Sequence, residues 1–243
     1  MDRLTDKPLA DRIALITGAS RGIGAAAAAA LAAAGAHVIL TGRTTGGLEE
    51  IEDAIYAAGG SATIAPVDFL EPDAVARLAT ALSARWDRLD ILVLNAAMLG
   101  TLGAVATIDP KELARVMTLN VSAQAALLAA FDPMLRRAPA GRVIGLTSKV
   151  AGTPRAYWGE YGASKAAFEV LLNCYGAEVA NISRVRTALI DPGATRTAMR
   201  AQAYPGEDPA SVKPPETVAA RIAHLLATDF DTGHFERIDA VSV

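Results

Sequence analysis

Short apolar runs alternate with longer helical patterns along the whole chain. The short runs are apolar on both faces, which is typical of buried strands; they cover residues 12–17, 37–41, 62–67, 89–95, 142–148, 185–190 and 235–241. The stretches between them are amphipathic or alanine-rich and long enough for crossover helices, near residues 23–34, 47–58, 72–86, 111–137, 157–180 and 215–228. The pattern therefore predicts strands and helices in alternation.

Strands that are apolar on both faces and joined by helices favour a parallel sheet covered on each side, with right-handed crossovers. We expect a doubly wound, Rossmann-type α/β fold of about seven parallel strands, in a single domain over residues 1–243. In such sheets ligands bind beyond the carboxyl ends of the strands. Residues directly after each strand are therefore the candidates for chemistry.

Residues 192–214, "PGATRTAMRAQAYPGEDPASVKP", interrupt this alternation. Three prolines, at positions 205, 209 and 214, disfavour one continuous helix. Long loops inside compact domains are usually functional, so this segment is predicted to be a lid over the site. Because it offers little apolar anchoring, we expect residues 194–213 to be mobile without ligand and ordered with it.

Composition narrows the class of protein. Hydrophobic residues make up 52% of the 243 residues and charged residues 20%, which excludes a disordered chain and predicts a large core. The net charge is −3 and the basic residues are scattered, so nucleic acid is not an expected partner. The most apolar run, residues 25–36, is too short to span a bilayer, and the start lacks a signal-peptide pattern. We expect a cytoplasmic protein with no membrane partner.

Cysteine and histidine usage points away from disulfides and metals. Cys174 is the only cysteine, which excludes an intrachain disulfide, and it is expected on a buried helix face. The three histidines, His37, His224 and His234, lack metal-ligand spacing. No metal site is predicted.

The first predicted strand runs into "TGASRGIG", residues 17–24. A turn that brings backbone N–H groups close to a pyrophosphate needs glycine where a Cβ atom would collide, and a helix N-terminus adds partial positive charge. The pattern alone also fits a structural turn, but its place after the first strand favours a dinucleotide. The candidate cofactor-binding residues here are Gly18, Ser20, Arg21, Gly22, Ile23 and Gly24.

The end of the second strand bears on the choice of nicotinamide cofactor. NAD-binding proteins commonly place a carboxylate there to bind the ribose hydroxyls, and none is present in "LTGRT". Arg43 and Thr44 follow the strand instead, and with Arg21 two guanidiniums can clamp a 2′-phosphate. Each arginine alone is equally consistent with a solvated surface charge. Together they favour NADP(H) over NAD(H).

The stretch "EYGASKAAF" places Tyr161 four residues before Lys165, on one face of a predicted helix. This spacing also fits an ordinary helix surface. A phenol of pKa ~10 donates a proton poorly at neutral pH, and a nearby ammonium lowers that pKa by stabilising the phenolate. Ser148 ends the fifth strand and can either orient a substrate oxygen or cap the next turn. Asn120 lies within a predicted helix, where asparagine tends to bond the backbone instead.

Six motifs stand in the order and at the spacing of one known family; they are "TGASRGIG", "LNAA" (94–97), "LNV" (119–121), Ser148, "YGASK" (161–165) and "DPG" (191–193). With them the chain resembles, over almost its whole length, the short-chain dehydrogenase/reductase family in its compact single-domain form. Parts of it look like a bacterial subgroup of uncharacterised oxidoreductases. The resemblance implies hydride transfer between an alcohol and a carbonyl, with Tyr161 as general acid/base. The catalytic set that it implies is Asn120, Ser148, Tyr161 and Lys165.

The resemblance also implies contacts to the cofactor. Asp68 is the expected partner of the adenine amine, and Lys165 of the nicotinamide ribose. The remaining cofactor-binding residues implied are Asn95, Ala96, Tyr161, Pro192, Gly193, Thr195 and Thr197. Asn95 is equally consistent with a role in stabilising the sheet. Family members are usually homodimers or homotetramers, and we expect the same here.

Two questions stay open at this point. The first concerns three basic residues, which either select an anionic substrate or are solvated surface charges: Lys149, Arg196 and Arg200. The pocket itself is expected to be shaped by Tyr157, Trp158 and the lid. The alternative to an enzyme is a dinucleotide-binding sensor or scaffold without turnover. Retention of all four implied catalytic residues disfavours that alternative.

Overall fold

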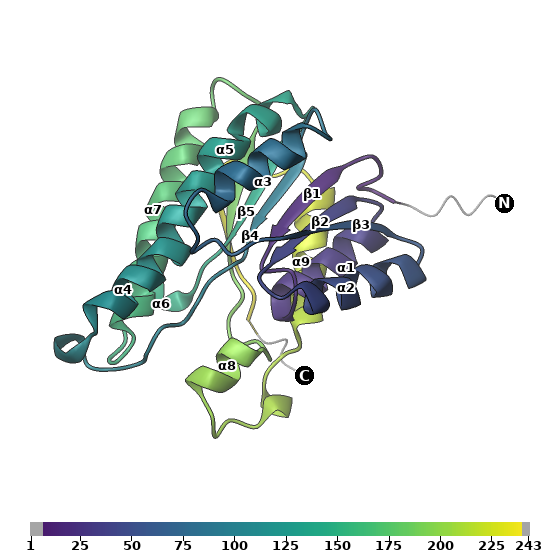
Figure 1. Ribbon diagram of the computed structural model, residues 1–243. Helices are drawn as coiled ribbons and strands as arrows, with labels where there is room; N and C mark the ends of the chain where they lie inside the picture. The colour runs from purple at the N-terminus through teal and green to yellow at the C-terminus, as the bar shows by residue number, and fades with distance from the viewer. Residues whose placement is uncertain (1–6, 240–243) are drawn as a thin grey trace.

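Seven parallel strands form the central sheet in the computed structural model, which describes residues 7–239, in the order β3-β2-β1-β4-β5-β6-β7 (Figure 1). The strands are β1 (Ile13–Thr17), β2 (His37–Gly42), β3 (Ser61–Pro66), β4 (Ile91–Leu94), β5 (Arg142–Leu146), β6 (Arg186–Asp191) and β7 (His234–Arg237). The strand order reverses between β1 and β4, as in doubly wound sheets. The predicted fold class is confirmed.

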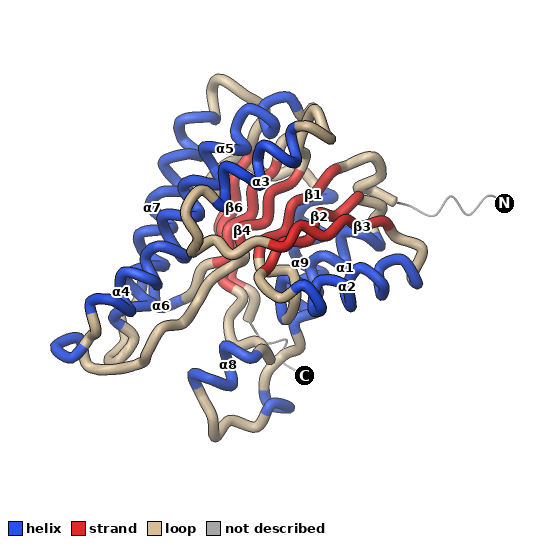
Figure 2. The backbone as a smooth tube through the Cα atoms, in the orientation of Figure 1, coloured by secondary structure: helices blue, strands red, loops and turns tan. Residues whose placement is uncertain are grey.

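Two layers of helices cover the sheet (Figure 2). One layer holds α1 (Gly22–Ala33), α2 (Thr45–Ala57) and α9 (Pro215–Ala227); the other holds α3 (Ala74–Ser83), α5 (Ala123–Arg137) and α7 (Gly159–Val179). Successive strand residues point to opposite faces, so Leu15 and Ile16 of β1 belong to different core clusters. This double burial is the reason why the strands read as continuous apolar runs.

Helix α7 lies very close to the sheet because glycines face it. A Cβ atom on Gly145 of β5 would lie 2.5 Å from the Cδ2 atom of Leu172. A Cβ atom on Gly176 of α7 would overlap the hydroxyl of Thr187 on β6. The close approach brings the first turns of α7 against the carboxyl end of β5, where the candidate catalytic residues lie.

The predicted helix over residues 111–137 is interrupted. It consists of α4 (Pro110–Met117), a π-helical turn at Thr118–Ser122, and α5. By length and composition this whole stretch is apolar enough to cross a membrane, but α5 buries Leu127 and Phe131 in the core beside the sheet. It therefore packs as a core helix does.

Two smaller expectations differ from the structure. The last strand ends at Arg237, and residues 240–241 of its predicted range lie outside the described residues. The prediction that Cys174 is buried was wrong, because it is exposed. The buried stripe of α7 passes through Phe168, Leu172 and Gly176, and Cys174 falls on the opposite side of the helix.

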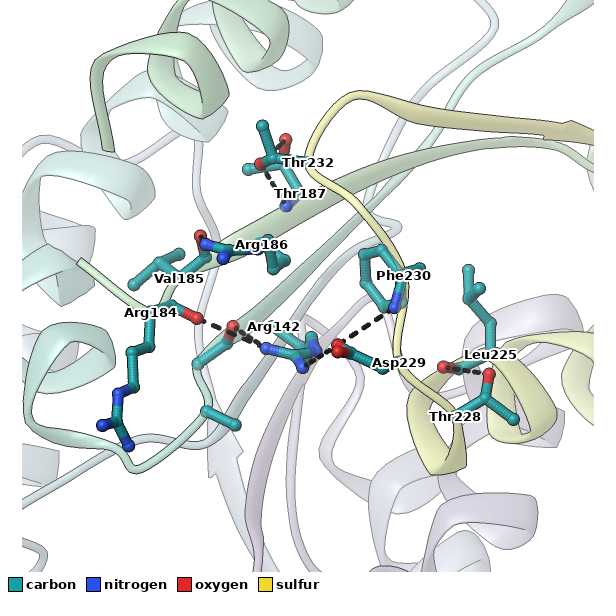
Figure 3. Close-up of polar contacts among 12 residues, drawn as sticks. Arg142, Arg184, Val185, Arg186, Thr187, Leu225, Thr228, Asp229, Phe230 and Thr232 are labelled. Atoms are coloured by element: carbon teal, nitrogen blue, oxygen red, sulfur yellow. Dashed lines mark hydrogen bonds and ion pairs between the residues drawn. The ribbon is translucent and has the colours of Figure 1, made fainter. Parts of the chain in front are cut away.

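Polar contacts join the segment between α9 and β7 to the amino-terminal ends of β5 and β6, away from the candidate site (Figure 3). Arg142, the first residue of β5, donates from Nη2 to Oδ1 of Asp229 at 2.9 Å, and its guanidinium lies 5.3 Å from the centre of the Phe230 ring. The backbone N–H of Thr187 donates to the Thr232 hydroxyl at 3.1 Å. These contacts fix the connection from α9 to β7 against β5 and β6.

The predicted lid, residues 192–214, extends beyond the carboxyl end of the sheet and carries α8 (Ala198–Ala203) and a 3₁₀ turn at Pro209–Ser211. The expectation that the segment is not one continuous helix is confirmed. Its two ends are joined, because the N–H of Arg196 donates to the carbonyl of Lys213 at 2.8 Å and Lys213 Nζ donates to the carbonyl of Ala194 at 3.0 Å. The base of the lid is therefore held by hydrogen bonds, and the mobility of the segment stays a prediction.

Candidate active site

The glycine turn after β1 is built so tightly that side chains do not fit at two positions. Gly18 has φ +67°, and a Cβ atom on it would lie 3.0 Å from Nδ2 of Asn95. A Cβ atom on Gly24 would overlap the carbonyl oxygen of Gly18. The turn leads directly into α1, whose first amides have no partner within the helix. Such a turn can hold a diphosphate on backbone N–H groups.

Asn95 ties the ends of two neighbouring strands together. Its Nδ2 atom donates to the carbonyls of Thr17 at 2.8 Å and Gly18 at 3.2 Å. The Thr17 hydroxyl in turn accepts the N–H groups of Asn95 and Ala96, each at 2.9 Å. The side chain of Asn95 thus has the structural role that its sequence position left open, and through it shapes the glycine turn.

The two arginines proposed to bind a 2′-phosphate come from adjoining turns. Ser20 in the first turn packs against Gly42 in the second, since a Cβ atom on Gly42 would lie 3.4 Å from the serine hydroxyl. Arg21 and Arg43 are the residues that directly follow this pair, so both arginines come from the place where the two turns meet. Both arginines are exposed, and neither forms an ion pair within residues 7–239. Arg43 and Asp68 line the same hollow of about 600 Å³. The arrangement leaves two cations available to an anionic ligand.

Lys165 carries its charge in the interior of the protein. Its Nζ atom donates to the carbonyl of Leu146, at the end of β5, at 2.8 Å, and lies 5.8 Å from the centre of the Tyr161 ring. Burial lowers the pKa of Lys165 to about 8, although the carboxylate of Glu169 acts in the opposite direction. Tyr161 and Lys165 therefore occupy one buried helix face, as their spacing predicts.

The protein environment alone does not favour ionisation of Tyr161. The ring is buried, with 7% of its surface exposed, and burial raises the pKa of the phenol above its ordinary value of 10.0. The carboxylate of Asp191 raises it further. This is opposite to the lowering expected from Lys165 alone, because burial disfavours the charged phenolate. Ionisation here requires further positive charge.

Asn120 sits where the helix widens into the π-helical turn and is almost fully buried. Its Oδ1 atom accepts the N–H of Met98 at 2.9 Å, and its Nδ2 atom donates to the Met98 carbonyl at 2.9 Å and to the Ser164 hydroxyl at 3.0 Å. Ser164 donates onward to the carbonyl of Tyr161 at 2.8 Å. Asn120 thus joins the segment after β4 to the helix of Tyr161 and Lys165.

Ser164 and Gln124 were missed by sequence reasoning. Ser164 is fully buried and lies inside "YGASK", three residues after Tyr161, so its position on the Tyr161 face was a usable signal. Gln124 donates from Nε2 to the carbonyl of Ala96 at 3.0 Å and is 2% exposed. An apolar helix gave no sign that this glutamine reaches the end of β4.

Ser148 immediately precedes α6 (Lys149–Gly152), in extended backbone conformation. Its side chain makes no capping hydrogen bond to that helix, so the structural alternative for this serine is not realised. The residue is half-buried two positions beyond Leu146, the residue that holds Lys165. Its hydroxyl is therefore available to another oxygen.

The lid begins against the glycine turn. Gly193 has φ +59°, and a Cβ atom on Gly22 would lie 3.3 Å from Cγ2 of Thr197. The hydroxyl of Thr195 donates to the carbonyl of Pro192 at 3.0 Å, and that of Thr197 accepts the N–H of Arg200 at 3.1 Å to cap α8. Both threonine side chains stabilise the lid locally, beside the predicted cofactor site.

The charges at the mouth of the site differ in their surroundings. Arg200 forms a double hydrogen bond with the Glu207 carboxylate, at 2.7 and 2.6 Å. Lys149 and Arg196 are exposed. Arg200 therefore acts within the lid, which removes it from the candidates for binding an anionic substrate.

Comparisons of sequence and structure agree with one another. The profile of the short-chain dehydrogenase family matches residues 12–208. The chain is 36% identical over 224 residues to YciK, an uncharacterised oxidoreductase of Escherichia coli, and the alignment covers 91% of this chain and 88% of YciK. The residues matched by the family profile include the glycine turn and the Tyr161 helix.

Two solved structures are similar over nearly the whole chain. A short-chain dehydrogenase from Shigella flexneri, crystallised with NADP, has a TM-score of 0.91 at 35% identity and covers 96% of this chain and 98% of its own. Another from E. coli CFT073, crystallised with NADPH, has a TM-score of 0.91 at 36% identity with the same coverage. The order of strands and helices is therefore shared with proteins that hold this cofactor.

Proposed function

Because the chain belongs to the short-chain dehydrogenase family, we propose that it is an NADP-dependent oxidoreductase that interconverts an alcohol and a carbonyl by hydride transfer. The expected family and its bacterial relatives are confirmed by the comparisons. The observation that carries the proposed reaction is the buried ammonium of Lys165 beside Tyr161. A buried cation lowers the stability of the fold, so its presence beside Tyr161 supports a catalytic use.

The residues at the strand ends suit a dinucleotide, because Gly18 and Gly24 allow a tight turn that leads directly into the N-terminus of α1, where backbone N–H groups can bind a diphosphate. NADP(H), when bound, supplies or accepts the hydride. We propose that Arg21, Arg43 and Thr44 hold its 2′-phosphate and Asp68 its adenine. The remaining contacts are assigned to Ser20, Gly22, Ile23, Asn95, Ala96, Tyr161, Lys165, Pro192, Gly193, Thr195 and Thr197. The NADP and NADPH complexes of the two relatives support this choice of cofactor.

In the proposed mechanism Tyr161 donates a proton to the carbonyl oxygen in reduction and removes one from the alcohol in oxidation. Ser148 donates a hydrogen bond to the same oxygen and orients it. Lys165 stabilises the phenolate, and the positive charge of an oxidised nicotinamide adds to this effect. Asn120 fixes the helix that carries the pair, through Ser164.

We further propose a small-molecule substrate, a cytoplasmic location and a homodimeric or homotetrameric assembly. The rival proposal is a dinucleotide-binding sensor or scaffold without turnover. The retained Lys165 argues against it, since cofactor binding alone has no need for a proton donor beside a buried ammonium.

Replacement of Tyr161 by phenylalanine tests the proposed reaction. Turnover should fall by about 10²- to 10⁴-fold, because a positioned proton donor contributes that much to rate. The affinity for NADPH, measured by calorimetry, should stay within a few-fold, since the lost hydroxyl acts in the transition state. Carbonyl compounds are screened first by NADPH fluorescence with the wild type.

Tyr56→Phe is the control, because this tyrosine is exposed on α2, in the other layer of helices. Retention of most of the wild-type rate by Tyr161→Phe on an active substrate would contradict the catalytic assignment. NADPH binding with no turnover of any screened carbonyl would favour the sensor.

A further inference from the structure

An aromatic residue of the lid reaches the wall of the catalytic site. Tyr204 follows α8, and its ring centre lies 5.8 Å from that of Trp158. Trp158 in turn meets Tyr161 edge to face, with the ring centres 6.1 Å apart. Three rings thus connect the lid to the proposed proton donor. Sequence reasoning had assigned Trp158 to the pocket but gave Tyr204 no separate role.

Two guanidiniums hold the ring of Tyr204. That of Arg200 lies 3.6 Å from the ring centre, and Glu207 fixes Arg200 through the double hydrogen bond. The guanidinium of Arg155 lies 5.4 Å from the same ring and donates from Nη1 to the Tyr204 hydroxyl. One arginine comes from the lid and the other from the connection between α6 and α7.

The opposite side of this contact is fixed to the sheet and helices. Arg155 also lies over the Trp158 ring, at 5.5 Å, and the Trp158 N–H donates to the Arg155 carbonyl at 3.2 Å. The carbonyl of Tyr157 accepts the N–H of Gly103 at 3.1 Å, which joins this connection to the segment after β4. Trp158 therefore lies on the side of the contact that is tied to the segment after β4, and Tyr204 lies on the side of the lid.

Resting on the proposed reaction, we propose that Tyr204 determines substrate size: it closes the pocket against Trp158 and limits the group that can sit beside the carbonyl at Tyr161. Cation–ring contacts at exposed sites are individually weak, so the lid holds Tyr204 in place without locking it. Compact carbonyl compounds fit under the ring, while bulky ones have to displace it. The preferred substrate class is therefore a small carbonyl compound.

The first measurement does not depend on turnover. The chain has two tryptophans, so a Trp86→Phe background leaves Trp158 as the single fluorophore. Tyr204→Ala in this background should increase the quenching of Trp158 by acrylamide, because the lid ring no longer covers it. Tyr56→Phe, on α2, should leave the quenching unchanged. Equal quenching in all three proteins would overturn the proposed wall.

The second measurement compares butanedione with its phenyl-substituted analogue. Tyr204→Ala should raise the kcat/KM ratio of the bulky to the small diketone by about tenfold, chiefly through a lower KM for the bulky one. Tyr204→Phe keeps the ring and should leave the ratio within about twofold, as should Tyr56→Phe on α2. An unchanged ratio in Tyr204→Ala, with wild type active, would overturn this inference alone. A wild type that reduces no carbonyl compound would instead overturn the proposed reaction, whatever the fluorescence shows.

Discussion

The floor of the proposed catalytic site and the outer part of the lid that faces it are held by different kinds of contact. In the floor, which comprises Asn120, Ser148, Tyr161 and Lys165, the side chains of Asn120 and Lys165 form buried hydrogen bonds to backbone groups of other elements. Beyond its hydrogen-bonded base, the lid is held by ion pairs and ring contacts among its own exposed or half-buried side chains and with the neighbouring connection. Buried, backbone-directed bonds fix positions far more rigidly than exposed side-chain pairs do.

This difference separates the tasks of the two regions. The proposed proton transfer needs atoms held to within fractions of an ångström. The floor holds the ammonium of Lys165 in a fixed place, although burial of a charge is unfavourable for the fold. Substrate entry needs a boundary that opens, and pairs near the surface can separate at small expense in free energy. The predictions that follow test each half of this contrast.

The largest effect is expected from Lys165→Met. The rate should fall by about 10²- to 10⁴-fold, because the phenolate of Tyr161 loses its neighbouring cation. NADPH affinity should fall as well, since we propose that the same ammonium binds the nicotinamide ribose. Kinetics with an active diketone and calorimetry with NADPH measure the two losses. Lys111→Met, which removes an exposed lysine in the first turn of α4, is the matched control, and an equal loss there would undo the distinction.

The same substitution should stabilise the fold at neutral pH. The pKa of Lys165 is about 8 in the folded chain against 10.5 in the unfolded one, so below pH 8 the folded state carries the full cost of a buried charge. Lys165→Met removes that cost, which the pKa shift sets at about 3 kcal/mol, and loses the bond to Leu146, worth about 1 kcal/mol. A net gain of about 2 kcal/mol in the free energy of unfolding follows from the two.

The pH dependence of the stability difference between the wild type and Lys165→Met tests the same buried charge independently. Between pH 8 and 10.5 the unfolded chain binds more protons at Lys165 than the folded one, so wild-type stability rises with pH relative to the variant. The raised pKa of Tyr161 acts in the opposite direction above pH 10, but both proteins contain that residue. Urea unfolding at pH 7, 9 and 10 should show the advantage of the variant shrinking. A constant difference would mean that the pKa of Lys165 is not lowered in the folded protein.

A smaller effect is expected from the two arginines proposed to bind the 2′-phosphate. Replacing Arg21 and Arg43 together by alanine should abolish a preference for NADPH over NADH of at least about tenfold, equivalent to about 1.4 kcal/mol. NADH affinity should persist, because the glycine turn is untouched. Calorimetry with both cofactors measures the preference, and Arg115→Ala on α4, also exposed, serves as control. Equal affinities of the wild type for NADPH and NADH would refute the phosphate clamp.

The floor could be predicted from the sequence and most of the lid could not. Periodicity gave all seven strands, and the Tyr161–Lys165 spacing gave a shared face, because both follow from backbone geometry that any helix or strand obeys. The π-helical turn at Asn120 and the raised pKa of Tyr161 depend on burial, which spacing does not reveal. Arg155, Tyr204 and Arg200 meet across nearly fifty residues, and no local pattern marks that contact.

The smallest effect concerns the hinge of the lid. Glu207→Gln removes one charge of the pair with Arg200, whose contribution is small because solvent screens a pair near the surface. Backbone amides of α8 should then exchange with deuterium up to a few-fold faster. Those of α7 should keep their rates, because both residues of the pair belong to the lid. Glu216→Gln, in the first turn of α9 and outside the lid, is the control. We also expect exchange over residues 194–213 in the wild type to slow when NADPH binds, since the lid base at Thr197 touches the glycine turn. If α8 and α7 respond equally to Glu207→Gln, the lid and the floor form one cooperative unit, and the division between a rigid floor and a separable lid is wrong.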